Sequence, residues 1–427
     1  MKKFKEFLLE STEKQKINLP FLQTQTSKKI NEVIEENGGE IFIVGGAVRD
    51  AIRGEKDIKD IDFLVRFIPN EELVDILKPI ADKSSDGSPK VNEVGKSFGV
   101  VTATIDGIDF DFALPRIGET YQKGGKHSEG VEVEVDAEAK IEKDLGRRDF
   151  TFNAMAVDIE GNLIDPYGGM EDLKNGQIKA VGDPIKRFDE DPLRILRAIQ
   201  FANRMGFDIE EKTKEAMETI QDELVSSTDS GDLRVPGDRI IEELKKAWLK
   251  SKDGNEKLIQ VLDETDIGIT LFGSQFDPIN VKGKDEVLQV IAFFFNGGDE
   301  KLKEWNTPSK YLHAIDLARN FADDEEPWTF VNDANKPFME QVKEFFQQTD
   351  NKKGLERVEK ALSDDIPLSP KELAVNGKRL MEFGLKGQEI GLAQKELLSA
   401  IWRGKVKNIE EKLLDYIFEE KEKTDER

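Results

Sequence analysis

Ile41-Phe-Ile-Val-Gly-Gly-Ala-Val-Arg-Asp50 and, shortly after it, Asp60-Ile-Asp-Phe-Leu-Val-Arg-Phe67 are the stretches that decide the fold of this chain. The apolar run 41–44 predicts a buried strand, and the glycines after it predict a turn into a short helix that ends at Gly54. Within the second stretch, residues 61–67 predict another strand, because they alternate in character. This strand–turn–helix–strand unit indicates a mixed α/β domain in the first part of the chain.

The turn at Gly45 and Gly46 has the composition of an anion site. Glycines let backbone amides approach an anion closely, and the exposed N–H groups and dipole of a helix start favour phosphate. Arg49 follows in the first turn of the expected helix, where its guanidinium could bond the same anion with two hydrogen bonds. Because a glycine pair is most often only a turn, this interpretation depends on the carboxylates that follow.

Those carboxylates are Asp60 and Asp62, which are separated by one residue. On a strand, that spacing places both side chains on one face, which suits two divalent cations about 4 Å apart. Asp111, in Ile108-Asp-Phe-Asp-Phe112, offers a third carboxylate, although a polar outer face explains it equally well. Since the glycine turn and the carboxylate pair occur in one short unit, we expect a metal and triphosphate site.

Composition restricts the chemistry further. The chain of 427 residues has no cysteine and two histidines, His127 and His313. This excludes disulfides and thiolate metal sites and argues against a Ser-His-Asp mechanism. Acid–base or metal work must therefore rest on carboxylates. The net charge of -24 argues against a nucleic-acid partner on average, although a local basic groove can lie on an acidic molecule.

No apolar run approaches the roughly 20 residues that span a bilayer, and the N-terminus lacks the pattern of a signal peptide. We therefore expect a cytoplasmic protein with no membrane partner. Residues 117–130 predict a loop, and beyond about residue 170 the pattern becomes that of amphipathic helices, the first at 188–206. The fold class is thus α+β, and further strands are expected at about 98–106, 108–114 and 154–159, the first two joined by the hairpin signal Asp106-Gly107.

Two later segments carry charged groups beside packed residues. Arg147-Arg-Asp-Phe-Thr-Phe-Asn-Ala-Met155 places two arginines before an apolar stretch interrupted by Asn153. A buried amide needs hydrogen-bond partners, which suits contacts to a sugar, but a structural role is about as probable on this pattern alone.

In Phe188-Asp-Glu-Asp-Pro-Leu-Arg-Ile-Leu-Arg-Ala198, Asp191 suits a helix N-cap before Pro192. Asp191 and Arg194 then stand three residues apart on one face. They form either a weak intrahelical ion pair or a donor–acceptor pair that reads the edge of a base.

The chain resembles the class II CCA-adding tRNA nucleotidyltransferases and their relatives, the bacterial poly(A) polymerases. The resemblance rests on Gly45-Gly-Ala-Val-Arg-Asp50, Asp60-Ile-Asp62, Arg147-Arg-Asp-Phe-Thr151 with Asn153-Ala154, and Glu190-Asp-Pro-Leu-Arg194 with Arg197. Arg234-Val-Pro-Gly-Asp-Arg-Ile-Ile-Glu-Glu-Leu244 is similar to a further family motif but departs from it at Gly237-Asp238. Leu368-Ser-Pro-Lys-Glu-Leu-Ala-Val-Asn-Gly377, with Glu389-Ile-Gly391, resembles the tail of the bacterial CCA-adding members.

The resemblance implies a polymerase-β-like nucleotidyltransferase head followed by an all-helical neck, body and tail. It would place an N-terminal helical extension at 1–37, the catalytic head at 38–165, the base-selecting neck at 166–250, a helical body at 251–365 and a tRNA-binding tail at 366–427. Residues 255–365 match no motif of the family.

By the same resemblance, Asp60 and Asp62 hold Mg²⁺. Asp111 is a further catalytic carboxylate and candidate metal ligand because of its position in the expected strand, and not because of the resemblance. Triphosphate and ribose would be held by one set of residues: Gly45, Gly46, Arg49, Arg147, Arg148, Asp149 and Asn153. Asp191 and Arg194 would select cytosine and adenine, with Arg197 supporting them.

The implied substrates are CTP, ATP and the acceptor and T-arm of tRNA, to whose 3′ end C, C and A are added without a template and with release of pyrophosphate. The alternatives are a poly(A) polymerase, an enzyme that adds only CC or only A, and a catalytically dead RNA-binding protein. The oligomeric state is not predicted.

Overall fold

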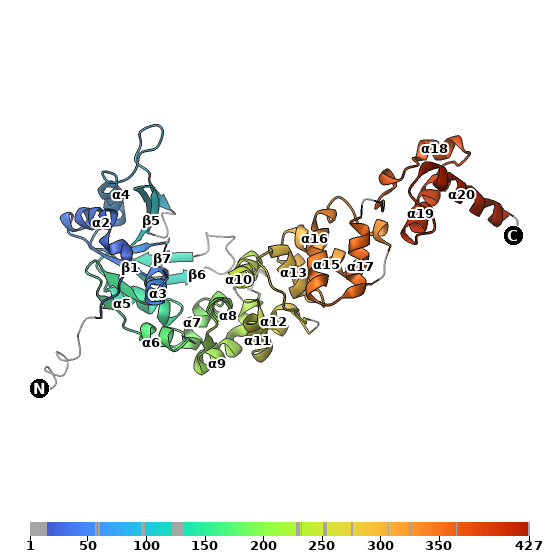
Figure 1. The fold of residues 1–427 in the computed structure, drawn as a ribbon. Helices are drawn as coiled ribbons and strands as arrows, with labels where there is room; N and C mark the ends of the chain where they lie inside the picture. The colour runs from blue at the N-terminus through green and yellow to red at the C-terminus, as the bar shows by residue number, and fades with distance from the viewer. Residues whose placement is uncertain are drawn as a thin grey trace, which may run out of the picture. The chain divides into compact units, whose positions relative to one another are not determined.

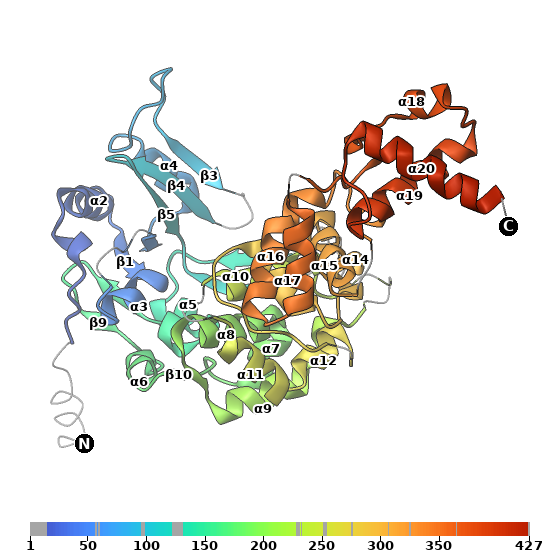
Figure 2. The ribbon, with the colours of Figure 1, turned by 45° about the vertical axis from the view of Figure 1, so that its right-hand side comes forward.

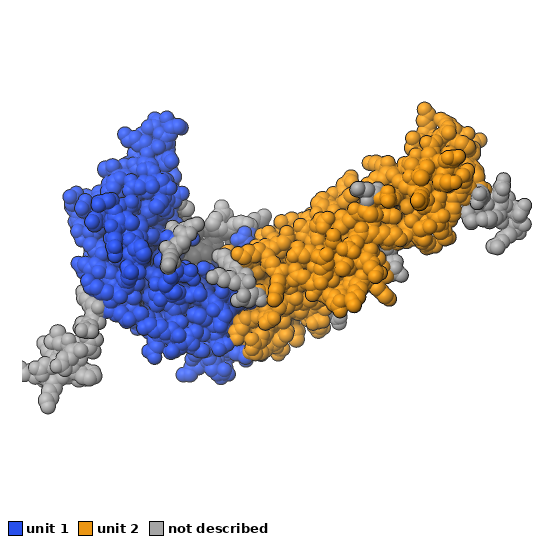
Figure 3. All heavy atoms as spheres, in the orientation of Figure 1, with its two compact units in different colours: residues 1–243 blue, residues 244–427 orange. Residues whose placement is uncertain are grey.

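The computed structural model describes residues 15–425, apart from 56, 57, 59, 95–98, 122–130, 228–230, 232, 251–253, 275, 306, 324, 325 and 364. The chain forms two compact units, residues 1–243 and residues 244–427, which Figure 3 colours separately. The first unit contains the sheets and the second is helical, so the expected α+β class is confirmed. The finer division into head, neck, body and tail stays a prediction.

The first unit is built on a seven-stranded sheet in the order β3-β4-β5-β2-β1-β8-β9. Neighbouring strands are antiparallel except β2 and β5, which are parallel. The predicted strands 41–44 and 61–67 are therefore both present and central. The strands are β1 (Glu40–Val44), β2 (Asp62–Arg66), β3 (Val91–Val94), β4 (Val100–Ile105), β5 (Ile108–Ala113), β8 (Ala156–Asp158) and β9 (Leu163–Ile164).

Alternation along β1 and β2 divides the sheet into two faces. Ile41, Ile43 and Phe63 face α2 (Gln25–Glu36), and together with residues of α2 they line a small cavity between the helix and the sheet. Val44 and Leu64 face the other way and pack in one cluster with α5 (Ile141–Gly146). Since side chains alternate along a strand, Asp62 lies on the same face as Leu64, toward α5.

The outer strands form the hairpin that the sequence predicts. Asp106 and Gly107 join β4 to β5 with φ angles of 53° and 79°, as a two-residue hairpin turn requires. Figure 2 shows β3, β4 and β5 side by side, with α4 (Asn70–Leu77) packed against them. The alternation in β5 buries Phe110 and Phe112 on one side and directs Asp109 and Asp111 to the other.

A loop and a helix expected in the first unit differ from the structure. Residues 117–121, expected in a loop, belong to β6 (Arg116–Tyr121), which pairs with β7 (Val131–Val135); residues 122–130, with His127, lie outside the described residues. The helix expected over 188–206 is divided into α7 (Pro184–Glu190) and α8 (Leu193–Met205), with Asp191 extended between them at φ -148°. Pro192 explains the division, because it lacks an N–H and disfavours the helical conformation in the residue before it.

The remaining helices of this unit lie below the sheet and to one side of it in Figure 1. A short parallel pair, β10 (Gln177–Ile178) and β11 (Asp208–Ile209), also occurs beyond residue 170, where no strand was expected. The helices are α3 (Gly46–Ile52), α6 (Gly169–Lys174), α9 (Glu211–Ile220) and α10 (Gly237–Lys250), whose last turns lie beyond residue 243.

The second unit is helical, as expected, and its described residues include two apolar clusters. One joins α13, α15, α16 and α17, and the other joins α18, α19 and α20. No helix among the described residues is long and apolar enough to cross a membrane. Its helices are α11 (Glu256–Glu264), α12 (Ile267–Phe272), α13 (Glu286–Phe294), α14 (Glu300–Glu304), α15 (Ser309–Ala322), α16 (Met339–Gln348), α17 (Lys352–Ala361), α18 (Gly377–Glu382), α19 (Gln388–Trp402) and α20 (Glu410–Asp425).

Candidate active site

A cleft of about 550 Å³ in the first unit brings together the motifs that are scattered along the sequence. It opens between the first residue of β2, Asp62, the glycine turn before α3, the segment after α5 and the start of α8. All but one of the predicted site residues line it: Gly45, Gly46, Arg49, Asp62, Asp111, Arg147, Arg148, Asp149, Asn153, Asp191, Arg194 and Arg197.

Asp62 and Asp111 form the acidic wall of this cleft. They are register partners on the parallel strands β2 and β5, and adjacent strands lie about 4.8 Å apart. Thr102 donates a hydrogen bond to Asp111 Oδ1 at 2.5 Å. Asp60 is exposed and precedes β2, which begins at Asp62. The expectation that Asp60 and Asp62 share one strand is therefore wrong, although Asp60 remains close enough to act on the charge of Asp62.

The electrostatics of this wall favour a bound cation. Although Asp62 keeps contact with solvent, burial of its carboxyl raises its pKa, the nearby charges of Asp111 and Asp60 raise it further, and Arg148 opposes them. A cation between the carboxylates would relieve this repulsion, and carboxylate oxygens are the ligands that hard divalent ions prefer. Among the described residues, no three or more His, Cys, Asp or Glu side chains converge closely enough to hold a metal ion unaided. The donors therefore fit an ion that completes its shell with water and substrate oxygens, as Mg²⁺ does.

The glycine turn faces the acidic wall across the cleft. Gly45 has φ 69° and precedes α3. A Cβ atom at this position would lie 2.8 Å from Nη1 of Arg148, closer than real Cβ contacts. The backbone conformation therefore favours glycine here, and a Cβ atom would also displace the guanidinium of Arg148, the far end of a long side chain, from the turn.

Arg49 is buried and held by its neighbours. Its Nε and Nη2 donate to the two carboxylate oxygens of Asp50 at 2.8 and 3.0 Å, and its Nη1 donates to Asn153 Oδ1 at 2.8 Å. Its guanidinium also lies 5.4 Å from the ring centroid of Phe201. The predicted two-bond contact of Arg49 is thus made to Asp50 inside the protein, while the residue still contributes positive charge to the cleft wall.

Asp149 continues this network toward α8. It is buried, and it accepts hydrogen bonds from Asn153 Nδ2 at 3.0 Å and from Arg197 at 2.9 and 2.6 Å. Burial alone would raise the pKa of Asp149, but Arg197 and the hydrogen bonds hold it below its ordinary value. The side chains of Asp50, Arg49, Asn153, Asp149 and Arg197 therefore form one chain of polar contacts from α3 to α8, which we call the polar bridge.

Asp144 is a site residue that the sequence motifs did not single out. Its carboxylate is fully buried and accepts two hydrogen bonds from Arg147 at Oδ1 and two from Arg148 at Oδ2, at 3.0 to 3.2 Å. Burial would raise the pKa of Asp144, whereas Arg148 and Arg147 hold it below its ordinary value. The signal was present, since Asp144 precedes the two arginines by three and four residues and one helical turn brings such residues together.

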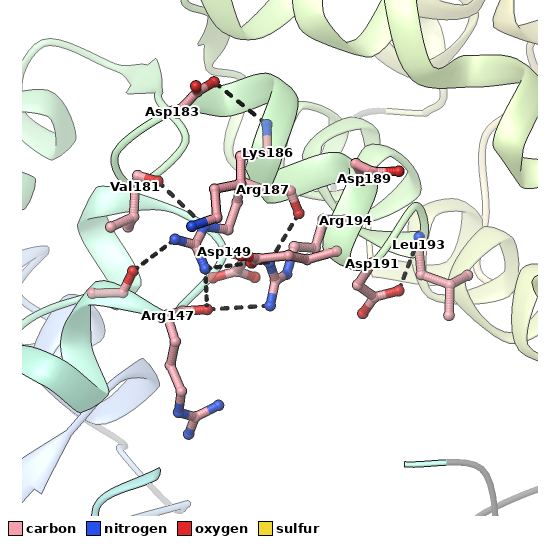
Figure 4. Close-up of polar contacts among 12 residues, drawn as sticks. Arg147, Asp149, Val181, Asp183, Lys186, Arg187, Asp189, Asp191, Leu193 and Arg194 are labelled. Atoms are coloured by element: carbon pink, nitrogen blue, oxygen red, sulfur yellow. Dashed lines mark hydrogen bonds and ion pairs between the residues drawn. The ribbon is translucent and has the colours of Figure 1, made fainter. Parts of the chain in front are cut away.

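Arg194 is bound to backbone carbonyls where α7, α8 and the end of α5 meet (Figure 4). Its guanidinium donates to the carbonyl of Arg187 at 2.9 Å, the carbonyl of Arg147 at 3.1 Å and the carboxylate of Glu190 at 3.2 Å. Asp191 accepts from the backbone N–H of Leu193 at 3.2 Å, a helix-start contact close to the predicted cap. The predicted base-reading pair therefore lies at one mouth of the cleft, fixed by contacts within the protein.

Arg187 is a second residue that the motifs missed. It donates to the carbonyls of Gly146 and Arg147 at 2.9 and 3.0 Å and to Glu190 at 2.8 Å. Arg187 and Arg194 thus neutralise the carbonyls at the end of α5, where the helix dipole is negative, and they join α7 and α8 to the segment that carries Arg147.

The same region matches a known family. Residues 41–179 match the model described as the poly A polymerase head domain. Over nearly its whole length the chain is similar to a CCA-adding enzyme of Bacillus pumilus, with 29% identity over 408 residues, 90% of this chain and 94% of that protein. The resemblance predicted from the motifs is therefore confirmed.

Solved structures give the same fold. A Bacillus stearothermophilus CCA-adding enzyme in complex with CTP has 22% identity and a TM-score of 0.62, covering 94% of this chain and 98% of that one. A Thermotoga maritima CCA-adding enzyme complexed with tRNA-CCA has 22% identity and a TM-score of 0.61, covering 95% and 99%. At this identity, the likeness shows that the fold is shared.

Proposed function

We propose that this chain, which carries a poly A polymerase head domain at residues 41–179, is a CCA tRNA nucleotidyltransferase. It would add C, C and A to the 3′ end of tRNA from CTP and ATP, without a template. The observation that carries the proposal is the single cleft in which a carboxylate wall, a glycine turn with arginines and the Asp191–Arg194 helix start face one space. The similarity to curated CCA-adding enzymes along almost the whole chain favours CCA addition over poly(A) synthesis or partial addition.

In this reaction the RNA 3′-hydroxyl oxygen attacks the α-phosphorus of the nucleotide, the bond to the β-phosphate oxygen breaks, and pyrophosphate leaves. Asp60 and Asp62 would hold divalent metal, Mg²⁺ in our proposal, and such ions polarise the attacking hydroxyl and neutralise the leaving pyrophosphate. The second oxygen of Asp111, the one that Thr102 does not bond, is suited to accept the hydroxyl proton. Asp111 lies beside Asp62, where that proton would be released.

The triphosphate would lie against the glycine turn. The backbone of Gly45 and Gly46 and the guanidiniums of Arg148 and Arg147 line that part of the cleft, where the Gly45 N–H itself donates to the carbonyl of Met155 at 3.2 Å. Because Asp144 fixes both guanidiniums before substrate arrives, little side-chain entropy is lost when phosphate binds. Arg49, Asp149 and Asn153 bond one another, so we propose that they support the ribose and triphosphate site by keeping its wall rigid.

Base selection is assigned to Asp191 and Arg194, with Arg197 in support. Asp191 has acceptor oxygens for an exocyclic amine, and Arg194 has donors for a ring nitrogen or carbonyl. Cytosine and adenine both carry an exocyclic amine next to an acceptor, whereas uracil presents the opposite pattern. A fixed donor–acceptor pair would therefore accept CTP and ATP and reject UTP.

The partner in this proposal is the acceptor and T-arm of tRNA, bound by shape and backbone contacts. The predicted tail at 366–427 is assigned to that contact and the predicted neck at 166–250 to base selection. A cytoplasmic location stays an expectation from the sequence.

One assay tests the proposal: tRNA transcripts that lack CCA, CA or A are incubated with labelled CTP or ATP and Mg²⁺. Addition that stops at CCA supports it, and Asp62→Ala is the inactive control. Long A-tails would identify a poly(A) polymerase, addition that stops after CC would identify a partial enzyme, and no incorporation by the native protein would refute the enzymatic proposal.

A further inference from the structure

A second recess adjoins the active-site cleft and has no part in the roles assigned above. It has a volume of about 720 Å³ and is lined by residues of α5, β6, α7 and the start of α8, all within the first unit. Arg147 and Arg194 line both spaces, which adjoin at these two residues. We call it the α5 recess.

The α5 recess is positively charged in a protein of net charge -24. Five cationic side chains line it against two carboxylates. Arg187 and Arg194 share Glu190, and Arg147 is paired with Asp144. Lys140 and Lys143 differ from them: both are exposed, and within the described part of the chain their amines make no hydrogen bond or ion pair. Two free lysines on one side of an open recess are suited to phosphate groups.

Other lining residues fit a nucleotide chain better than a lone anion. Tyr167 presents a half-buried ring, whose hydroxyl donates to the carbonyl of Glu142 at 3.2 Å. Aromatic faces accept any base by stacking. Gly118 and Gly146 leave the floor without bulky side chains, and Gly146 must do so because a Cβ atom there would meet the Tyr167 hydroxyl at 2.3 Å.

We infer that the α5 recess binds the single-stranded 3′ end of the RNA substrate, with Lys140 and Lys143 on its phosphates. The inference rests on the proposed function. The triphosphate occupies the glycine-turn side of the cleft, so the strand whose 3′-hydroxyl reacts must approach from another side. The α5 recess supplies that approach, because it shares Arg147 and Arg194 with the cleft.

The test measures RNA affinity apart from catalysis. The full chain is titrated, without nucleotide, against a fluorescent acceptor-stem hairpin with a single-stranded 3′ overhang and against the same hairpin made blunt. Lys140→Glu with Lys143→Glu should weaken binding of the overhang hairpin at least about tenfold at low salt. It should also reduce the slope of log affinity against log salt by about 1.4, since each single-strand phosphate contact contributes about 0.7.

The matched control is Lys174→Glu with Lys179→Glu, which reverses two exposed lysines of the same unit that line neither space. Its affinity for both hairpins should equal that of the native protein. The charge-reversed recess variant should bind the blunt hairpin normally and show an unchanged KM for CTP.

Equal weakening for both hairpins would place the lysines on the stem and overturn the inference. A raised KM for CTP with unchanged RNA binding would make the recess a nucleotide site and overturn it as well, as would no change at all. If the native protein binds the overhang through these lysines but adds no nucleotide, the proposed function fails while the inference about the α5 recess stands.

Discussion

Asp144→Asn tests whether the two arginines beside the glycine turn are held by one buried carboxylate. The substitution keeps the size of the side chain and removes its charge. At present Oδ1 accepts two N–H bonds from Arg147 and one from the backbone N–H of Arg116, and Oδ2 accepts two from Arg148. In asparagine, one of these oxygens becomes an NH₂ donor that faces a guanidinium, so either Arg147 or Arg148 must move.

The magnitude follows from burial and exposure. Removing one partner of a buried ion pair costs about 3–5 kcal/mol. The side chains of Arg147 and Arg148 keep 23% and 21% of their surface exposed, so the displaced arginine can reach water and the cost should lie near the lower value. If the displaced guanidinium no longer bonds the triphosphate, the lost charge-assisted hydrogen bond raises the KM for CTP about 10- to 100-fold.

Two spectroscopic signals separate the stability effect from general damage. All four tryptophans, at positions 248, 305, 328 and 402, lie in the second unit. In urea, tryptophan fluorescence therefore reports mainly the second unit, since only Trp248 lies in α10, the helix that begins in the first unit at Gly237, and far-ultraviolet circular dichroism reports both units. Asp144→Asn should move the circular dichroism transition to lower urea and leave the fluorescence transition in place.

The pH dependence has a definite sign. The pKa of Asp144 is held below its ordinary value in the folded protein. Its charge therefore stabilises the fold above the ordinary carboxyl pKa, and this contribution disappears as pH falls through the lowered pKa. The stability gap between native protein and variant should be constant near neutral pH and should narrow only below about pH 4.

Asp172→Asn is the control, since Asp172 is a partly buried carboxylate of the same unit that accepts from Thr151 at 2.8 Å. An Asp144→Asn protein that unfolds at the native urea concentration and keeps the native KM would refute the argument that Asp144 positions the arginines.

Three further predictions concern the cleft. Gly45→Ala should raise the KM for CTP at least about tenfold and destabilise the folded protein by about 1–2 kcal/mol. Gly54→Ala is the control, because Gly54 has a similar φ of 77° and a Cβ atom there would meet no atom within 4 Å, so it should show the backbone cost alone. Equal kinetics in the two variants would contradict the contact with Arg148. Asp62→Asn should reduce kcat by more than about 1,000-fold. In EDTA at neutral pH the variant should nevertheless be more stable than the native protein by less than about 1 kcal/mol, because the raised pKa of Asp62 means that folding disfavours its ionised form. A variant that melts at a lower temperature than the native protein would oppose this reasoning. Asp191→Asn, which retains an acceptor for the Leu193 N–H, should lower the CTP over UTP preference at least about tenfold with normal folding, and unchanged discrimination would remove Asp191 from base selection.

The strands and the glycine turn could be predicted because their signals are local. The apolar run 41–44 and the pair Asp106-Gly107 fix a strand and a hairpin without help from distant residues. The prediction of a loop at 117–130 was wrong over 117–121, because these residues pair with β7, and the local sequence does not indicate that pairing. The prediction of one helix at 188–206 was wrong because the apolar periodicity continues across Pro192, whereas the helical backbone is interrupted there.

Most of the predicted site residues do line the cleft, but the residues with which they form hydrogen bonds could not be predicted from the sequence. Arg49 and Asn153 are 104 residues apart and bond each other directly, and Asp149 meets Arg197 across 48 residues. Such pairs depend on the tertiary fold, so the contact of Arg49 with Asn153 could not be predicted from local sequence. Asp144 is the exception, because its spacing from Arg147 and Arg148 could have been read as a one-turn contact.

The polar bridge from Asp50 to Arg197 has a consequence for how the first unit opens. Its members come from α3, from the segment around Asn153 and from α8, and three of them are less than 9% exposed. Separating α8 from the sheet would take Arg197 away from Asp149 and leave that carboxylate as a buried charge without its cation, which is too costly for a local fluctuation. Amide protons along β1 and along α8 should therefore exchange with deuterium only when both elements unfold together. The proposed head ends at residue 165, and the proposed base-selecting neck begins after it. This boundary would therefore separate two roles, although the two parts unfold together as one cooperative unit.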